Sequence, residues 1–402
     1  MSSKKKVGVV TMYYRNSNYG ACLQAYALPY VINKMGYDCE QISFTFRNDD
    51  NSSLSQKIKD SIKNYGIKNT LNIIFEVINK KKEQKKNSLN GSAQLISTRD
   101  EAVARFRENR IPHSEKTYSN QSIDRCNGYD AYVCGSDQIW RIGWGFLNPG
   151  FWLSFVNDGG KKISYAASIS MNEIPEKEHI LVKNALADYD FISVRELQGK
   201  EILDSILEGE KDVNWVVDPT LLLTKEEWEE ITAENPYKDE KYIFAYLLGD
   251  KQEDRDEIMA YAERNGMKVI AIPYLLGEYR ACDENFGHIK LSDVSPELFV
   301  SLIRDAKEVI TDSFHGSVFS LIFNTPFRSL KRSSDESKDS MNSRIYSLLR
   351  LCECSDRVIG AKELSALSPS QDNMNFEKIN NVLKGERERC IDLLKGALGE
   401  EK

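Results

Sequence analysis

The sequence predicts an α/β fold with parallel sheets in two domains. Short apolar runs rich in β-branched residues alternate with stretches of helical periodicity along the 402-residue chain, and this alternation is typical of βαβ units. The runs pause near residue 217 and resume near residue 242, and a chain of this length is long for one hydrophobic core. We therefore expect an N-terminal domain of residues 1–220 and a C-terminal domain of residues 221–402.

Each predicted strand is an apolar run that ends in small or polar residues. The first domain has six such runs, at residues 7–12, 37–44, 131–134, 163–167, 191–194 and 215–217. The second has three, at residues 242–248, 267–273 and 309–311. Between the two sets, the turn-forming pair Asn235 and Pro236 follows a helical stretch. The helix after the first run contains Pro29, which is expected to bend it or end it early.

Two further segments are predicted to be helical. Residues 48–119 are rich in Lys, Asn, Ser and Glu without a clear strand, which indicates a helical insertion. Within it, the lysine cluster at 80–86 follows the apolar stretch 73–78, so a basic amphipathic helix could rest on an anionic membrane. A helix that packs its apolar face on its own domain is favoured over this membrane contact. Residues 376–398 predict a C-terminal helical tail.

Composition narrows the class of partner. The chain has 54 basic and 61 acidic side chains and a net charge of −7, so no overall cationic field would attract nucleic acid. No apolar stretch is long enough to span a membrane, and the apolar run near the N-terminus is too short for a secretion signal. The eight cysteines show no metal or disulfide spacing. We expect a cytoplasmic protein, with peripheral contact at the inner face of the membrane only if the insertion binds lipid.

In parallel sheets the ligand lies beyond the carboxyl ends of the strands, so the loops there are the candidate sites. After the first run, Asn18, Tyr19 and Gly20 lead into a helical pattern that includes Gln24, and free backbone N–H groups at such a helix start can bind an anion. No dinucleotide or P-loop glycine motif is present. Nucleotide binding at this loop therefore has no support from a motif.

The loop at 135–140 joins a hydroxyl, a carboxylate and an amide, from Ser136, Asp137 and Gln138, to the aromatic Trp140. Such a set can bond sugar hydroxyls and stack on a sugar face. Ser136 or Asp137 could also cap a helix whose Trp140 is buried in the core, and both interpretations can hold together because a cap at a strand end also faces the cleft.

Arg195 ends the fifth run, where its guanidinium could clamp a phosphate or carboxylate. An ion pair with Glu196 is an equally good explanation from the residues alone.

The strongest local pattern runs from the strand at 309–311 through Asp312, Ser313, His315, Gly316 and Ser317 into an apolar helix. At a helix N-terminus the dipole disfavours the charged imidazolium, whereas a nearby aspartate favours it, so His315 could act as acid or base near neutral pH. A core histidine bonded to a backbone carbonyl is an equally good explanation from spacing alone. None of the four histidines has the spacing of a metal site.

Six short motifs follow one another along the chain. They lie at residues 18–28, 135–140, 164–168 (which includes Ser168), 193–196, 217–222 and 311–316, and a further piece that includes Arg344 lies at 342–349. The ordered set resembles the polysaccharide pyruvyl transferase family. The resemblance extends from about residue 7 to residue 350 and leaves out the insertion.

This resemblance implies two Rossmann-like domains facing a cleft, as in GT-B glycosyltransferases. It also implies phosphoenolpyruvate as donor substrate without a further cofactor, and a hexose of a surface polysaccharide (exopolysaccharide or capsule), or of its lipid-linked precursor, as acceptor. The product would be a cyclic pyruvate ketal. His315 matches the histidine that the family uses as general acid or base, and Arg195 matches the arginine that binds the donor.

The remaining site residues are predicted from their positions at strand ends. Lys331, Arg344 and the helix start after Gly316 are expected to offset the charge of the donor. Ser313 stands where one common form of the family has an arginine. The predicted substrate-binding residues are Asn18, Tyr19, Gly20, Gln24, Ser136, Asp137, Gln138, Ser168, Asp312, Ser313, Gly316, Ser317, Lys331 and Arg344.

Two other functions fit the same pattern. One is a GT-B glycosyltransferase that uses a nucleotide-sugar donor, for which an acidic residue near a strand end of the second domain would hold the ribose. The other is a non-catalytic subunit of a polysaccharide assembly system, in which His315 and Arg195 would have no chemical role.

Overall fold

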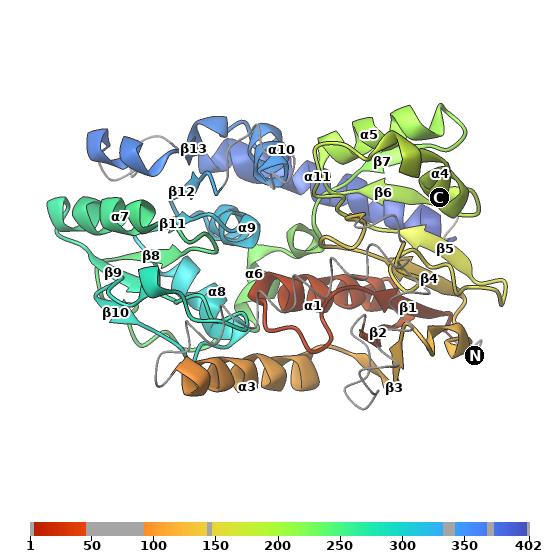
Figure 1. Cartoon of the computed structure of the whole chain (residues 1–402), viewed down its shortest axis with the longest axis horizontal. Helices are drawn as coiled ribbons and strands as arrows, with labels where there is room; N and C mark the ends of the chain where they lie inside the picture. The colour runs from red at the N-terminus through yellow and green to blue at the C-terminus, as the bar shows by residue number, and fades with distance from the viewer. Residues whose placement is uncertain (1–3, 46–91, 143–146, 333–341, 368–373, 400–402) are drawn as a thin grey trace.

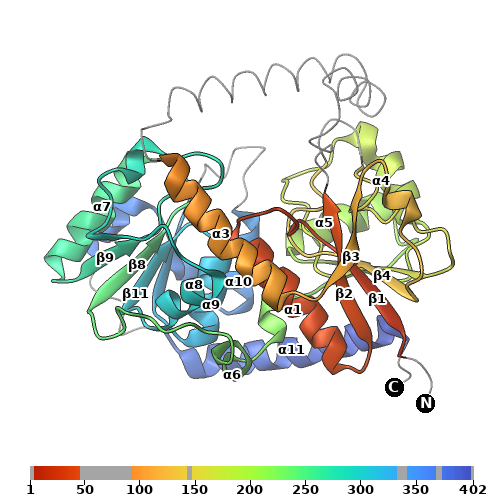
Figure 2. The same cartoon turned by 90° about the horizontal axis from the view of Figure 1, so that it is seen from below.

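The computed structural model describes residues 4–45, 92–142, 147–332, 342–367 and 374–399. Two parallel sheets lie at opposite sides of the molecule, with β1 to β7 on one side and β8 to β13 on the other (Figure 1). Helix α1 lies between them when the molecule is seen from below (Figure 2). The α/β class and the parallel sheets predicted from the sequence are confirmed.

The first sheet has the strand order β3-β2-β1-β4-β5, and every neighbouring pair is parallel. Two isolated bridges, from Ile163 to Phe191 and from Ala167 to Val194, attach the parallel pair β6-β7 to its edge. The strands are β1 Lys6–Val10, β2 Asp38–Thr45, β3 His113–Ser119, β4 Ala131–Cys134, β5 Lys161–Ser164, β6 Ile192–Val194 and β7 Val213–Trp215.

The second sheet has the order β10-β9-β8-β11-β12-β13 and is also parallel throughout. Its strands are β8 Tyr242–Tyr246, β9 Lys268–Ala271, β10 Ile289–Lys290, β11 Glu308–Thr311, β12 Phe327–Leu330 and β13 Val358–Ile359. In both sheets the first strand in sequence lies inside the sheet. The chain therefore changes winding direction beside that strand, which is where ligands bind in doubly wound sheets.

The helices connect and cover the strands. They are α1 Tyr19–Lys34, α3 Ser92–Arg110, α4 His179–Leu186, α5 Leu197–Leu207, α6 Lys225–Glu229, α7 Gln252–Arg264, α8 Pro296–Arg304, α9 Phe314–Phe323, α10 Ser343–Leu351 and α11 Phe376–Leu398. None of the helices in the described ranges is long and apolar enough to cross a membrane.

Helix α1 does not end at Pro29, contrary to one of the two outcomes expected for that residue. Proline has no N–H to donate, so the carbonyl of Ala25, four residues earlier, lacks its usual helical partner. The side chain of Gln41 in β2 donates to this carbonyl at 2.9 Å. A buried side-chain amide thus satisfies the carbonyl, and the helix continues to Lys34.

The predicted helical insertion is wrong over its last part. Residues 113–119 form the edge strand β3, which pairs with β2. Its sequence is mostly polar because most of its side chains are exposed, and this hid the strand from a search for apolar runs. Helix α3 precedes it as predicted, whereas the lysine cluster at 80–86 and its proposed membrane contact lie outside the described residues.

The C-terminal helix α11 extends beneath both sheets (Figure 2). It contacts the short 3-10 helix Pro219–Leu222 and also α9, which belongs to the half of the molecule built around the second sheet (the second half; the first half is built around the first sheet). Toward its end, Cys390 Sγ accepts a bond from the backbone of Val217 and the carbonyl of Ala397 accepts one from Lys161. The tail expected with the second domain therefore also covers the first sheet.

One hydrophobic core cluster continues through both halves of the molecule. Tyr19, in the first turn of α1, stacks on Phe299 of α8 with ring centroids 4.6 Å apart, and its hydroxyl donates to the carbonyl of Val294. Trp228 of α6 packs edge-on against Phe319 of α9. The two sheets are thereby held together by buried aromatic contacts.

Candidate functional site

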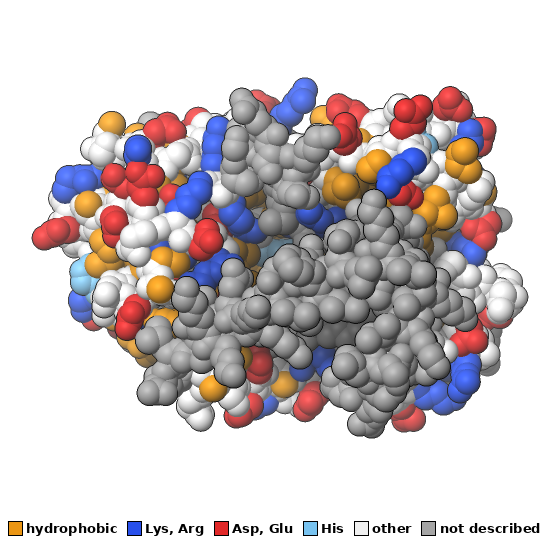
Figure 3. Space-filling model, viewed as in Figure 1, with side chains coloured by type: hydrophobic (Ala, Val, Ile, Leu, Met, Phe, Trp, Pro, Cys, Tyr) orange, Lys and Arg blue, Asp and Glu red, His pale blue; other side chains and the backbone are white. Residues whose placement is uncertain are grey.

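A polar cavity of about 440 Å³ lies between the two sheets. Its walls come from the start of α1, the loop after β4 and the loops after β8, β9, β11 and β12, so loops from both halves contribute. On the face drawn in Figure 3, Lys and Arg side chains gather near the middle of the molecule. The lining residues are Asn18, Asp137, Gln138, Leu248, Gly249, Asp250, Tyr274, Leu276, Arg280, Ser313, Phe314, His315, Arg332 and Arg344.

His315 lies in the first turn of α9, where the sequence predicts it. Ser313 caps this helix by accepting a bond from the N–H of Gly316. Gly316 must be small, because a Cβ there would lie 2.7 Å from Thr311 Oγ1. The imidazole is buried apart from the part that lines the cavity, and its Nε2 atom lies 3.7 Å from Oδ2 of Asp218. The imidazole nitrogen therefore faces a carboxylate rather than a backbone carbonyl.

Gly20 gives the ring of His315 the space that it occupies. A Cβ on Gly20 would lie 2.0 Å from Nδ1 and 2.5 to 2.6 Å from Cγ and Cε1 of His315. No side chain fits at that distance, so glycine is required here. The predicted site residue Gly20 therefore acts by letting helices α1 and α9 approach each other at the cavity.

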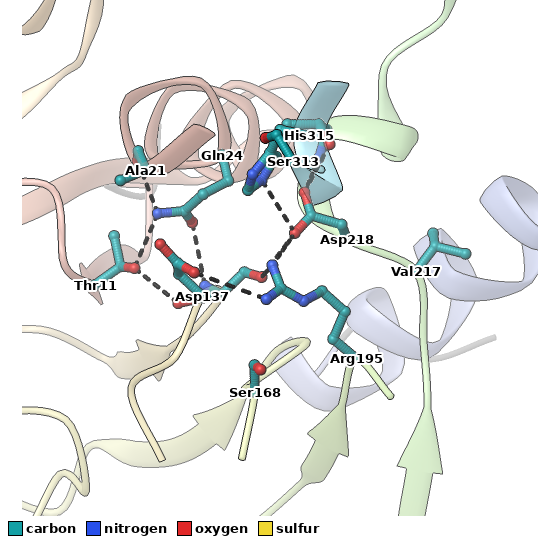
Figure 4. A network of polar contacts seen from close by, with 12 residues as sticks. Thr11, Ala21, Gln24, Asp137, Ser168, Arg195, Val217, Asp218, Ser313 and His315 are labelled. Carbon is teal, nitrogen blue, oxygen red and sulfur yellow. Dashed lines mark hydrogen bonds and ion pairs between the residues drawn. The ribbon is translucent and has the colours of Figure 1, made fainter. Parts of the chain in front are cut away.

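Asp218 is the centre of the polar network drawn in Figure 4. Its side chain is fully buried after β7, and its Oδ1 accepts bonds from the backbone N–H and the hydroxyl of Thr220. Its Oδ2 accepts bonds from Ser136 Oγ at 2.9 Å and from Arg195 Nη1 at 2.7 Å. Burial alone would raise the pKa of this carboxyl, but His315 and Arg195 lower it well below its ordinary value.

Arg195 lies one layer behind the cavity wall, at the end of β6. Besides Asp218, its guanidinium bonds Ser136 Oγ and Glu196, lies 3.7 Å from Asp137 and stacks over the ring of Phe314. Burial lowers the pKa of this group, but the surrounding carboxylates raise it above its ordinary value. The ion pair with Glu196 expected as an alternative is present. Arg195 Nη2, beside the cavity-lining Asp137, has no hydrogen-bond partner among the described residues.

The loop after β4 is fixed by buried bonds to α1. Gln24 accepts a bond from the backbone N–H of Ser136 and donates to Thr11, whose hydroxyl donates to the carbonyl of Ser136. This network places Asp137 and Gln138 in the cavity wall. Trp140 is buried and stacks on Trp152, so it is a core residue and does not stack on a sugar.

A second network holds the loop after β8. Asp312 accepts bonds from the backbone N–H groups of Leu248 and Gly249 at 2.6 and 2.7 Å, and it pairs with Arg332. The sequence placed Asp312 beside His315 as a charge partner, but its carboxylate faces this loop, and Asp218 is the carboxylate that faces the imidazole.

Among the described residues, three cationic side chains line the side of the cavity formed by the loops of the second sheet. Arg332 follows β12, Arg344 begins α10, and Arg280 stacks on Tyr274 with its guanidinium carbon 3.5 Å from the ring centre. Burial, together with the neighbouring Arg195 and Arg332, lowers the pKa of Arg344 to about 10. The positive charge gathered here favours an anionic ligand.

The cavity wall includes six of the sixteen predicted site residues: Asn18, Asp137, Gln138, Ser313, His315 and Arg344. Tyr19 packs between the two halves, Gln24 and Ser136 support the wall from behind, and Ser168 bonds Ser170 in the interior. Ser317 bonds Ser329 behind α9. Lys331 is exposed and outside the lining, because the next residue, Arg332, is the one that reaches the cavity.

Sequence patterns did not indicate Asp218, Arg280 or Arg332 as site residues. Asp218 lies in the family motif at residues 217–222, and its place directly after the predicted strand at 215–217 could have identified it. The two arginines lie in loops that carry no recognisable pattern, and only the fold brings them to the cavity.

Two parallel sheets with a cavity between their loops define a GT-B-like α/β protein with two Rossmann-like domains. Among solved structures, S. aureus MnaA with UDP is similar over 97% of this chain and 96% of that one, at 11% identity and a TM-score of 0.51. UDP-GlcNAc 2-epimerase from Methanocaldococcus jannaschii (11% identity, 95% and 92% of the two chains) and a UDP-glucosyltransferase from Polygonum tinctorium (9%, 100% and 100%) match with TM-scores of 0.47 and 0.45. No curated protein sequence matches the chain.

The family model for polysaccharide pyruvyl transferases matches residues 18–334. The chain belongs to this family, as the ordered motifs indicated.

Proposed function

We propose that this protein transfers a pyruvyl group from phosphoenolpyruvate to two hydroxyls of a hexose, which belongs to a surface polysaccharide or its lipid-linked precursor. The observation that carries the proposal is that His315 and three arginines, Arg280, Arg332 and Arg344, line one cavity at the start of helix α9.

The negative charge of the donor suits the side of the cavity that is lined by arginines. Phosphoenolpyruvate carries a phosphate and a carboxylate, and arginine binds such groups through two parallel N–H donors. We place the donor against Arg332, Arg344 and the N-terminal turn of α9, where the helix dipole also favours an anion. Ser313, the residue that replaces an arginine of the family, leaves this role to arginines from other loops.

Ketal formation needs two proton transfers that a single imidazole can assist. Two C–O bonds form between the acceptor hydroxyls and C2 of the enolpyruvyl group, and the C2–O bond to phosphate breaks. Of the two hydroxyl protons released, one ends on the C3 methylene, which becomes a methyl group, and one ends on the departing phosphate. His315 can accept a hydroxyl proton and return it as an acid.

The acceptor is placed on the opposite wall. Asn18, Asp137 and Gln138 present an amide, a carboxylate and a second amide to the cavity from the first half. These groups match the donors and acceptors of sugar hydroxyls. With the donor on the second half, the two substrates would meet at His315.

Purified protein is expected to release phosphate from phosphoenolpyruvate only in the presence of a suitable sugar acceptor and to form the pyruvylated sugar. His315→Ala should lower turnover by about 10²- to 10⁴-fold, because proton transfer would lose its catalyst. Phosphate release and product mass measure both. His179→Ala is the control, since His179 bonds the carbonyl of Ile174 away from the cavity.

Calorimetric titration separates this proposal from the alternatives. Binding of phosphoenolpyruvate without binding of nucleotide sugars is the expected result. Binding of a nucleotide sugar alone would instead favour a glycosyltransferase. Normal polysaccharide synthesis in cells that carry His315→Ala would favour a non-catalytic subunit.

A further inference from the structure

The imidazole of His315 has two nitrogen atoms in different surroundings. Nε2 is buried, faces Oδ2 of Asp218 at 3.7 Å, and has no hydrogen-bond partner among the described residues. Because this nitrogen is shielded from the cavity, a substrate cannot reach it without moving the ring.

Nδ1, in contrast to Nε2, is not a fully buried atom without a partner, and His315 lines the cavity. The Cβ position of Gly20 lies 2.0 Å from Nδ1 and almost equally far, at 2.5 and 2.6 Å, from the two neighbouring ring carbons. A point in the ring plane in front of Nδ1, at the same distance from Nδ1, would be clearly farther from those two carbons. Gly20 therefore packs on the face of the imidazole and does not occupy the in-plane direction of the Nδ1 lone pair.

The Asp218 carboxylate is held so that it cannot turn away. Oδ1 is bound by both the N–H and the hydroxyl of Thr220, and Oδ2 by Ser136 and Arg195. Every neighbouring group that bonds it is a donor, so the carboxylate stays an acceptor and its side facing His315 remains negative. A carboxylate beside one imidazole nitrogen fixes the proton on that nitrogen and leaves the other free to exchange protons.

We infer that Asp218 is a positioning residue that keeps the His315 proton on Nε2, so that Nδ1 is the atom that exchanges protons with the substrate. This inference rests on the proposed function for its catalytic meaning but not for its geometry. Arg195 serves the same arrangement, because it bonds Oδ2, the carboxylate oxygen that faces the histidine. The charged groups around the ring are Asp218 and Arg195 behind it and Asp137, Arg332 and Arg344 in the cavity wall.

The tautomer can be observed directly by NMR of protein labelled with ¹⁵N-histidine. The chain has only four histidines, so His315→Gln identifies the His315 signals by their loss. In the wild-type protein, at a pH where the ring is neutral, we expect the proton on Nε2. A proton on Nδ1 would overturn the inference, and this measurement needs no substrate and no variant of Asp218.

Asp218→Asn tests the consequence for turnover. The ring should lose its fixed tautomer, kcat should fall by on the order of 10²-fold or more, and KM for phosphoenolpyruvate should change only a few-fold. An unchanged histidine spectrum in a folded Asp218→Asn variant would contradict the positioning role.

Glu308→Gln is the matched control. Glu308 is also a buried carboxylate that pairs with an arginine, Arg328, but it lies at the start of β11, away from the cavity. The Glu308→Gln substitution should lower the unfolding free energy without changing the His315 tautomer or kcat. If the tautomer is as expected but no pyruvyl transfer occurs with any acceptor, the proposed function fails while the positioning of His315 by Asp218 stands.

Discussion

Single atoms decide the geometry around His315. The ring is placed between a carboxylate on one side and the bare Cα of Gly20 on the other. Neither neighbour is close to His315 in sequence. The histidine therefore depends on contacts from the first half of the chain for its orientation, although the helix that carries it belongs to the second.

Gly20→Ala is expected to lower kcat by about 10²-fold, because the added methyl would displace the imidazole and misplaced catalytic groups lose about this much. Steady-state kinetics and the His315 signals in the NMR spectrum measure the change. Gly385→Ala in α11 provides the control, since nothing lies within 4 Å of a Cβ there. It should leave kcat unchanged and stabilise the helix by about 0.5–1 kcal/mol.

The buried carboxyl of Asp218 predicts a specific response to acid. Its pKa in the folded protein is lowered relative to the unfolded chain, so its contribution to stability is complete above about pH 4 and is lost as the pH falls further. Below that pH the unfolding free energy should decrease by up to about 1.4 kcal/mol per pH unit through this group alone. Urea unfolding between pH 7 and 3 measures this slope.

In Asp218→Asn the unfolding free energy should depend less steeply on pH in acid than in the wild type, and the unfolding free energy at pH 7 should be lower. An equal slope in the two proteins would show that Asp218 does not titrate as the contacts imply.

At the level of elements, strand ends and the loops after them build the site. Asp312 illustrates this role: from the end of β11 it bonds two consecutive N–H groups in the loop after β8 and also Arg332, which follows β12. One carboxylate thus fixes the positions of two loops of the cavity wall.

Asp312→Ala should weaken phosphoenolpyruvate binding and lower the unfolding free energy by about 2–4 kcal/mol, because two N–H groups and one arginine lose their acceptor. Titration calorimetry and denaturant unfolding measure the two effects. Asp158→Ala is the comparison, since that carboxylate bonds Tyr132 and Gly128 on the far side of the first sheet. Equal phosphoenolpyruvate affinity in wild type and Asp312→Ala would remove Asp312 from this role.

Most of the strands that sequence patterns predicted have mostly buried side chains. Residues 131–134 were placed correctly to the residue because all four side chains are buried. Strands β3, β10, β12 and β13 were missed: β3 is polar, β10 and β13 are two residues long, and β12 contains Arg328, whose charge is neutralised by Glu308. Short or polar strands depend on their neighbours in the sheet and leave little trace in their own sequence.

The candidate site, like the strands, was predictable from the sequence only in part. Residues in a recognisable strand-loop-helix pattern, such as His315 and Asn18, were found. Arg280 and Arg332 were not found, because only the folded sheet brings the loops after β9 and β12 to the cavity. Asp218 lay within a recognised motif, but its contact with His315 joins two halves of the molecule and has no counterpart in sequence spacing.

At the scale of the whole molecule, the cavity joins two halves that also share one core. If the donor binds Arg332 and Arg344 and meets an acceptor bound to the first half, the two substrates link both walls of the cavity. A ligand that binds only the folded state stabilises the folded protein. At a hundredfold excess over its Kd, phosphoenolpyruvate should raise the unfolding free energy by about 2.7 kcal/mol.

Arg332→Gln should remove most of this stabilisation, because the side chain loses the charge that meets the donor. Arg389→Gln is the control, since Arg389 pairs with Glu386 on α11 outside the cavity. Thermal unfolding with and without ligand measures both. A donor-induced shift that is the same in Arg332→Gln and wild type would place the donor elsewhere.

The course of α11 affects how the protein is made. This helix is translated after both sheets, yet it covers Val217 and reaches Lys161 in the first half. While the ribosome is still adding the second half, the surface of the first half that receives Cys390, Leu394 and Leu398 has no cover. The first half can therefore reach its final stability only after α11 has been translated, and the nascent chain exposes apolar surface to chaperones until then.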